Sequence, residues 1–233
     1  MDWGGKKVLV FGGTSGIGRA TVEKLVALGA SVVAISRDPS KAADLTGADT
    51  AACDVRDREA MQALFAAHAP IDVIISAATG GDRASGPFLQ MDLDGYQGSF
   101  DKLWGYANVV QFGAPHLSET GNIVLVSGSP ARRARPGQAA LASVGGAVEQ
   151  LVRAVAVEIA PRRINVVSPG IIDTPMFGPD AEQRAKMLGG ATARHLIPRP
   201  GTPEEVADGI LFVAQNDFVT GTTIDVDGGW LLT

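Results

Sequence analysis

Three glycines near the N-terminus are spaced so that the backbone around them can bind phosphate groups. They stand in "GGTSGIGRA" at 12–20, which directly follows the apolar run "KVLVF" at 7–11. Glycines at 12, 16 and 18 permit a sharp turn and a close approach to a diphosphate, and the free N–H groups of the next helix face that anion. Such a turn can serve sterics alone, but its place between a strand and a helix favours phosphate binding. The predicted phosphate-binding residues are Gly12, Thr14, Ser15, Gly16, Ile17 and Gly18.

The second apolar run ends in two side chains that indicate the kind of dinucleotide. "SVVAIS" at 31–36 ends at Ser36 and is followed by Arg37. A site for NAD would carry a carboxylate there to bind the ribose 2′-hydroxyl. A hydroxyl and a guanidinium suit a 2′-phosphate instead, so NADP(H) is the predicted cofactor. The alternative for Arg37 is a solvated surface charge.

A carboxylate stands at the end of the next short strand, which is expected at 51–54. This is Asp54, within "CDVRD", at the edge where the strands of the sheet end. Asp54 would either hold the adenine amino group or start the helix that follows.

The elements that must position these residues alternate regularly between strand and helix. The strands are apolar runs rich in Val and Ile, and most are apolar continuously, which is typical of strands buried on both faces of a parallel sheet. The rhythm predicts an α/β fold, a single Rossmann-type doubly wound parallel sheet with helices on both faces, formed by one domain over 1–233. Strands are expected at 7–11, 31–36, 51–54, 71–76, 122–127, 164–168 and 222–226, and helices near 17–28, 57–68, 95–117, 138–160 and 203–215.

Composition limits the partners of the chain. A net charge of −5 argues against nucleic acid, whose binding proteins need a basic surface. The single cysteine, Cys53, cannot form an internal disulfide, so a reducing cytoplasmic location is expected. The apolar run at 7–11 is too short for a signal sequence or a membrane span, so no membrane partner is expected. His116 and His195 lack a second ligand at metal-binding spacing, and no metal site is expected.

Four motifs together resemble those of the short-chain dehydrogenase/reductase superfamily. They are "GGTSGIG" at 12–18, "CDV" at 53–55, "SPGIIDTPM" at 168–176 and "TGTTIDVDGG" at 220–229, and the resemblance extends over nearly the whole chain. It implies a parallel sheet of about seven strands, a nicotinamide cofactor, a small-molecule substrate and a homodimer or homotetramer. It also implies that Ile172 and Thr174 lie beside the nicotinamide carboxamide, and that Val55 and Ala77 contact the cofactor.

The residues that carry catalysis in that superfamily are an Asn, a Ser, a Tyr and a Lys, and none of them is kept here. The resemblance places Lys102 at the Asn position, Gly128 at the Ser position, Leu141 at the Tyr position and Gly145 at the Lys position. No tyrosine follows Tyr106, so the loss does not depend on the register. A positioned general acid is worth roughly 10²–10⁴ in rate. The usual proton relay is therefore predicted to be absent.

Lys102 is the residue best placed to replace that relay. On a helix it shares a face with Gly105 and Val109, so its side chain should point toward the strand ends, where it would donate a proton or hold the cofactor ribose. The alternative is a surface lysine paired with Asp101 or Asp94. Two hydroxyls that flank the Ser position, Ser127 and Ser129, either take part in the chemistry or only cap backbone groups.

Two functions remain open. The first is an NADP(H)-dependent oxidoreductase with a rebuilt active site, acting on an iminium, a strongly activated alkene or a carbonyl that is protonated by Lys102 or by water. The second is a catalytically silent NADP(H)-binding protein, either a redox sensor or a structural subunit of a hetero-oligomer. The long irregular region at 169–202 is predicted to be a lid and favours an enzyme. The basic run "RRARP" at 132–136 would attract an anionic substrate or is solvated surface charge.

Overall fold

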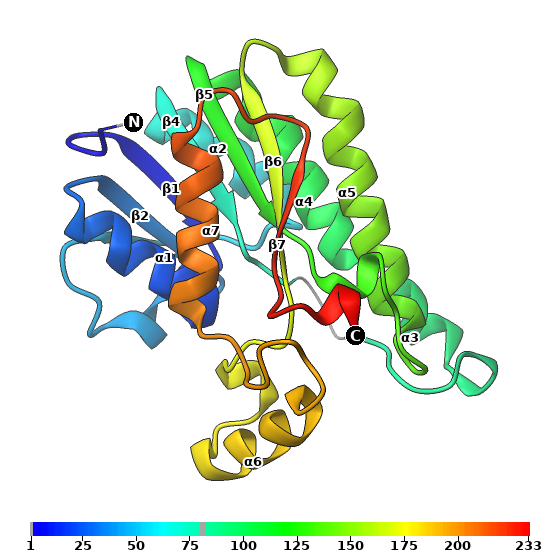
Figure 1. The fold of residues 1–233 in the computed structure, drawn as a ribbon. Helices are drawn as coiled ribbons and strands as arrows, with labels where there is room; N and C mark the ends of the chain where they lie inside the picture. Colours follow the sequence, from blue (N-terminus) through cyan, green and yellow to red (C-terminus); the bar gives the residue numbers. More distant parts are fainter. Residues whose placement is uncertain (1, 80–82) are drawn as a thin grey trace.

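Seven parallel strands form one sheet in the computed structural model, which describes residues 2–79 and 83–233 (Figure 1). Their spatial order is β3-β2-β1-β4-β5-β6-β7, and every neighbouring pair is parallel. The direction of winding reverses between β1 and β4, which is where ligands bind in open α/β sheets. The predicted fold class is confirmed. The strands are β1 (Lys7–Phe11), β2 (Ser31–Ser36), β3 (Asp49–Ala52), β4 (Ile71–Ser76), β5 (Leu117–Val126), β6 (Arg163–Pro169) and β7 (Thr223–Val226).

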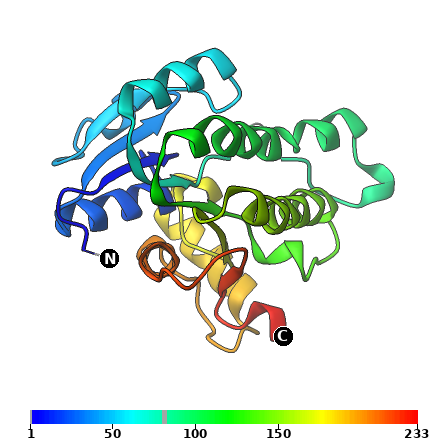
Figure 2. The same cartoon turned by 90° about the horizontal axis from the view of Figure 1, so that it is seen from above.

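Helices cover both faces of the sheet, as Figure 2 shows from above. One face carries α1 (Gly16–Ala27) and α7 (Pro203–Gln215), and the other carries α2 (Arg58–His68), α4 (Asp101–Gly113) and α5 (Ala139–Ile159). By length and composition α5 could cross a membrane, but its inner face packs on the sheet, so it is a core helix.

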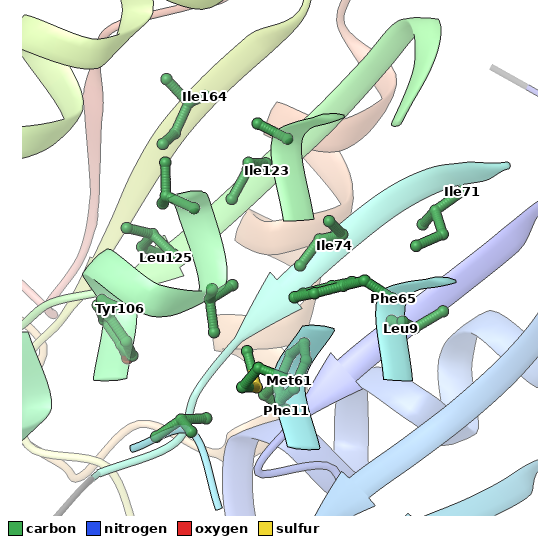
Figure 3. Close-up of a cluster of buried hydrophobic side chains, with 14 of the residues drawn as sticks. Leu9, Phe11, Met61, Phe65, Ile71, Ile74, Tyr106, Ile123, Leu125 and Ile164 are labelled. Carbon is green, nitrogen blue, oxygen red and sulfur yellow. The ribbon is translucent and has the colours of Figure 1, made fainter. Parts of the chain in front are cut away.

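Alternation along each strand divides the core into two clusters. In β1, Leu9 and Phe11 face α2, α4 and α5, whereas Val8 and Val10 face α1 and α7. Figure 3 shows the first cluster, in which Phe65 of α2 lies against Phe11 with ring centroids 5.6 Å apart. Both faces of the strands are therefore dry, which explains why their sequences are apolar without alternation.

The segment expected as one helix at 95–117 is two helices followed by the start of a strand. These are α3 (Leu93–Gly98), α4 and the first residues of β5. Between the helices, Ser99 Oγ donates to the carbonyl oxygen of Gly95 and accepts from the backbone N–H of Ala84. A serine that bonds back to its own helix interrupts regular turns, and here it also holds the loop after β4. In addition, β5 begins at Leu117, five residues before the expected start, and β3 lies two residues earlier than expected.

The region at 169–202 is not irregular throughout, so that expectation was wrong in part. It contains α6 (Ala181–Thr192), which projects beyond the carboxyl ends of the strands at the bottom of Figure 1. The N-terminus of α6 is capped by Asp180, whose carboxylate accepts from the backbone N–H groups of Glu182 and Gln183 at 2.9 and 3.1 Å. The helix was missed because its sequence is mostly polar and glycine-containing, without an apolar stripe.

Candidate active site

A cavity of about 700 Å³ runs along the carboxyl ends of the strands and crosses the switch point between β1 and β4. Segments that follow all seven strands contribute to it, and so does the first part of α5. The structure thus brings together, in one cavity, every residue that the sequence indicated for cofactor binding or catalysis. They are Gly12, Thr14, Ser15, Gly16, Ile17, Gly18, Ser36, Arg37, Asp54, Val55, Ala77, Lys102, Ser127, Ser129, Ile172 and Thr174.

The glycine turn forms a backbone cradle that side chains would fill. Gly12 has a φ of +76°, and a Cβ atom there would lie 2.9 Å from the carbonyl carbon of Ala77. A Cβ on Gly18 would collide with the carbonyl oxygen of Gly12. Ser15 occupies the N-cap of α1 without a side-chain capping bond, and the first turn carries no acidic residue. The N–H groups of this helix end are therefore left for an anion, and a diphosphate fits the cradle.

The far end of the cavity fits a 2′-phosphate. Ser36 Oγ is buried and has no hydrogen-bond partner among the described residues. Arg37 is exposed and forms no ion pair with any residue of 2–79 or 83–233. A buried hydroxyl without a partner is costly unless something else bonds to it. A phosphate oxygen would satisfy Ser36, and its charge would suit Arg37.

Asp54 is held by its neighbour and does not start a helix. Its carboxylate accepts from the backbone N–H, Nε and Nη2 of Arg56 at 2.9, 3.1 and 2.8 Å. These hydrogen bonds lower the pKa of Asp54. The N-cap of α2 is Asp57, which accepts from the backbone N–H of Ala60. The helix-start interpretation of Asp54 is therefore wrong, and contact with adenine stays a prediction.

The loop after β6 closes the cavity near the glycine turn. Thr174 is buried, and its Cγ2 lies 3.3 Å from where a Cβ on Gly16 would stand. Ile172 is buried as well and pairs with Gly201 through an isolated parallel bridge. The side chains of Met176 and Phe177, which follow, are exposed at the cavity. This segment is placed to cover a ligand that lies on the turn.

Lys102 points into the cavity and is not a surface lysine. Its ammonium donates to the backbone carbonyl oxygen of Ser127 at 3.3 Å and lies 5.4 Å from the ring centre of Tyr106. The Lys102 side chain is partly buried. This burial, with the nearby charge of Arg83, lowers the pKa of Lys102 to about 7. The alternative partner Asp101 is instead bound by Arg56 at 2.9 Å, so the surface interpretation was wrong.

The two serine hydroxyls are used by the fold. Ser127 Oγ donates to the carbonyl oxygen of Gly145 at 3.3 Å, and Ser129 Oγ donates to that of Pro169 at 3.1 Å. Ser129 is fully buried. Each hydroxyl donates its single proton in a hydrogen bond to a backbone carbonyl oxygen. The geometry favours the structural interpretation of both serines over the catalytic one.

The positions that the resemblance gave to the catalytic Ser, Tyr and Lys also lie on the cavity wall. Gly128, Leu141 and Gly145 line it, but none of them carries a group that can transfer a proton. A Cβ on Gly145 would lie 2.9 Å from Cβ of Ala131, so the segment around Ala131 occupies the space that a side chain at this position would need.

Neither tyrosine of the chain takes the missing position. Tyr106 is fully buried, its hydroxyl donates to the carbonyl oxygen of Val126 at 2.9 Å, and burial raises its pKa. The Tyr96 hydroxyl donates to Ser143 Oγ at 2.9 Å. The residues that line the cavity include neither tyrosine. Among the described residues that line the cavity, Lys102 is therefore the side chain best suited to donate a proton near neutral pH.

The basic run at 132–136 is tied to the C-terminal segment. Arg132 donates to Asp225 at 2.9 Å and approaches Glu149 at 3.3 Å. Arg133 donates to the carbonyl oxygen of Leu231 at 2.9 Å. The guanidinium of Arg135 lies 3.9 Å from the ring centre of Trp230. All three arginines are exposed and none of them lines the cavity. The geometry therefore favours the surface-charge interpretation of this run over attraction of a substrate.

Sequence reasoning missed several residues that line the cavity, chief among them Arg83 and Trp230. Trp230 directly follows the last of the four motifs, and this adjacency could have identified it. Arg83 follows β4 by several residues, and only its position beyond a strand end could have pointed to it. His195 packs edge-on against Trp230 at 5.1 Å, and His116 stacks on Phe65. Within the described ranges, no cluster of His, Cys, Asp and Glu could hold a metal.

Comparison with known proteins agrees with this geometry. The family model described as enoyl-(acyl carrier protein) reductase matches residues 12–231. L-xylulose reductase of Bos taurus is 33% identical over 241 residues, with 98% of each chain covered. Carbonyl reductase (NADPH) 2 of Sus scrofa is 30% identical, with 99% of this chain and 98% of its own covered. A crystal structure of a small-chain dehydrogenase in complex with NADPH has a TM-score of 0.87 at 29% identity, covering 98% of this chain and 100% of that one. The chain belongs to the short-chain dehydrogenase/reductase superfamily.

Proposed function

We propose that the chain is an NADP(H)-dependent oxidoreductase of small molecules in which Lys102 is the proton donor and acceptor. The observation that carries this proposal is the position of Lys102, which lines the same cavity as the glycine turn and whose ammonium donates to the backbone carbonyl oxygen of Ser127. A group that titrates near neutral pH is suited to general acid and base work. Within residues 2–79 and 83–233, a backbone carbonyl holds this amine, and no carboxylate forms an ion pair that would keep it protonated.

The residues present fit NADP(H). The glycine turn and the N-terminus of α1 would hold the diphosphate, Ser36 and Arg37 the 2′-phosphate, and Ile172 with Thr174 the nicotinamide. Relatives whose names or structures include NADPH support the same cofactor. When bound, the nicotinamide supplies or accepts the hydride. The chain itself has to orient the substrate, exclude water and handle the proton.

Lys102 performs the proton transfer in this proposal. In reduction of a carbonyl, the Lys102 Nζ proton goes to the oxygen, and the neutral amine is then reprotonated from water. In oxidation, the amine removes the hydroxyl proton. Leu141 and Val144 form an apolar wall on the α5 side, which lowers the access of water to the reacting atoms. An iminium or a strongly activated alkene would depend less on Lys102, because hydride transfer to it needs mainly orientation.

A second candidate is a silent NADP(H)-binding protein. It is favoured by the packing at Gly145, which leaves no room for the superfamily's lysine, and by the engagement of both tyrosines away from the cavity. In this interpretation the bound cofactor transfers no hydride to a substrate, and Lys102 only holds the cofactor ribose.

The test is a titration followed by a screen. NADPH and NADH are titrated into the purified protein and followed by nucleotide fluorescence. Carbonyls, enones and imines are then screened for loss of NADPH absorbance. Tight NADPH binding with turnover on one class supports the oxidoreductase. Tight binding without turnover on any class favours the silent protein, and failure to bind NADPH overturns both.

A further inference from the structure

Resting on the proposed function, we propose that the substrate carries a carboxylate beside an apolar body, and that Arg83 binds this carboxylate. Arg83 would then determine specificity at the end of the cavity that lies beyond the glycine turn, under β4, β5 and β6.

The guanidinium of Arg83 reaches a residue of the loop after β6 and pairs with no carboxylate of residues 2–79 and 83–233. Arg83 follows β4, lines the cavity and is exposed there. Its Nη1 lies 3.5 Å from Sδ of Met176, on the loop after β6. A thioether is a weak acceptor, and the other four N–H donors have no hydrogen-bond partner within the ranges that the structure describes. The planar fork of arginine matches a carboxylate through two parallel bonds.

The described carboxylates of the cavity lie at its opposite end. Asp38 and Asp54 line it, and they follow β2 and β3, on the other side of β1 from Arg83. Both are already engaged, Asp38 by Ser40 and Asp54 by Arg56. The end beyond β4 therefore carries two amine or guanidinium groups, Arg83 and Lys102, and no carboxylate among the described lining residues. A cleft with one sign of charge concentrates ligands of the other sign.

The basic run at 132–136 cannot supply this recognition, because its arginines are paired with the C-terminal segment and with Glu149. Arg83 is the permanently charged group that is left. Lys102 is unsuited to be the main anion ligand, since a proton donor has to change its charge during the reaction.

Several of the other side chains at this end of the cavity are apolar or aromatic. Leu141 and Val144 come from α5, Met176 and Phe177 from the loop after β6, and Trp230 from the C-terminal segment. Trp230 is held rigidly, since its Nε1 donates to the carbonyl oxygen of Arg133 at 3.2 Å. Apolar side chains in the same cavity end as a guanidinium fit a ligand with an apolar body and one anionic group.

The test measures binding alone, so it does not depend on turnover. Benzoate, phenylacetate and cinnamate, and the amide of each acid, are titrated into the protein saturated with NADP, and the heat of binding is recorded. The proteins are the native chain, Arg83→Gln and Arg58→Gln. Arg58 is an exposed arginine of α2 that does not line the cavity, so its variant matches the change in net charge. NADPH affinity is measured in parallel for each protein.

The native chain and Arg58→Gln are expected to bind at least one acid about ten times more tightly than its amide. In Arg83→Gln the affinity for the acid should fall by about ten- to hundredfold, so the preference for the acid over its amide is lost. The affinities for the amide and for NADPH should stay within a factor of two of the native values. Equal binding of acids and amides, no binding of any acid, or a preference that survives in Arg83→Gln would each overturn the inference. Loss of NADPH binding by the native chain would instead count against the proposed function.

Discussion

The ammonium of Lys102 donates a hydrogen bond to the backbone carbonyl oxygen of Ser127, 3.3 Å away. This contact joins the first turn of α4 to the end of β5, at the edge of the sheet where the cofactor turn lies. A carbonyl holds the amine in place without fixing its protonation state as a carboxylate would.

Removing the amine of Lys102 should greatly slow carbonyl reduction but change the affinity for NADPH little. Lys102→Met keeps the length of the side chain, so NADPH affinity should change less than threefold, while carbonyl reduction should slow by about 10²–10⁴-fold. Single-turnover loss of NADPH absorbance at saturating cofactor measures the step. Lys186→Met, at an exposed position of α6, is the matched control and should react at the native rate.

The rate should depend on pH with a definite sign. The pKa of Lys102 is lowered to about 7, first by burial and then by Arg83. A general acid has to be protonated, so carbonyl reduction should fall about tenfold per pH unit above pH 7. Arg83→Gln removes a neighbouring positive charge and should move this fall to higher pH, whereas Arg58→Gln should not. A flat profile between pH 6 and 9 would exclude Lys102 as the acid.

The same lysine should lower the stability of the fold below neutral pH. Its pKa is about 7 when folded, against 10.5 for an ordinary lysine. The unfolded chain therefore binds more protons between these values, and stability rises with pH across that window. Lys102→Met should be more stable than the native chain by roughly 1–3 kcal/mol at pH 6.5, because the open side of the cavity moderates the cost of burial. Urea unfolding should show this gap shrinking at pH 9.5; a gap independent of pH would contradict the assignment.

The glycine turn should tolerate no side chain where its backbone is closest. Gly18→Ala puts a methyl group against the carbonyl oxygen of Gly12, so NADPH affinity should fall more than tenfold, measured by fluorescence titration. Gly189→Ala in α6 is the control, because nothing lies within 4 Å of its added Cβ. That change should leave NADPH binding intact and stabilise the helix by up to about 1 kcal/mol. Normal NADPH binding by Gly18→Ala would mean that the turn is not the phosphate site.

Arg37 should select between the two nicotinamide dinucleotides. In Arg37→Gln the affinity for NADPH should fall about ten- to hundredfold, because a charge-assisted contact with the 2′-phosphate is lost. The affinity for NADH should stay within a factor of two. Paired titrations of each dinucleotide measure both, and an equal loss of the two would remove Arg37 from the 2′-phosphate site.

The sequence predicted the parts of the fold that depend on local patterning. Strands such as β1 and β4 are continuous apolar runs, and the turn at Gly12–Gly18 needs glycine because its backbone nearly touches itself. The break at Ser99 and the polar helix α6 were missed because neither changes the hydrophobic period.

The sequence predicted which residues line the cavity better than it predicted what each residue does there. Ser127 and Ser129 differ from catalytic serines only in their partners, Gly145 and Pro169, which lie 18 and 40 residues away in the chain. Asp54 and Arg56 are close in sequence, yet their mutual pairing becomes clear only from the side-chain geometry. Trp230 could have been identified from its place after the last motif, whereas only its position beyond a strand end pointed to Arg83.

The most direct test of the account is to follow the hydride itself. NADPH that carries deuterium at the transferred position of its nicotinamide is incubated with the protein and with carbonyl, enone and imine acceptors, including carboxylate-bearing ones, and the products are examined by mass spectrometry. We predict a product one mass unit heavier with the native chain, formed far more slowly from a carbonyl by Lys102→Met. Tight NADPH binding with no label in any acceptor would contradict the account and identify the chain as a silent cofactor-binding protein.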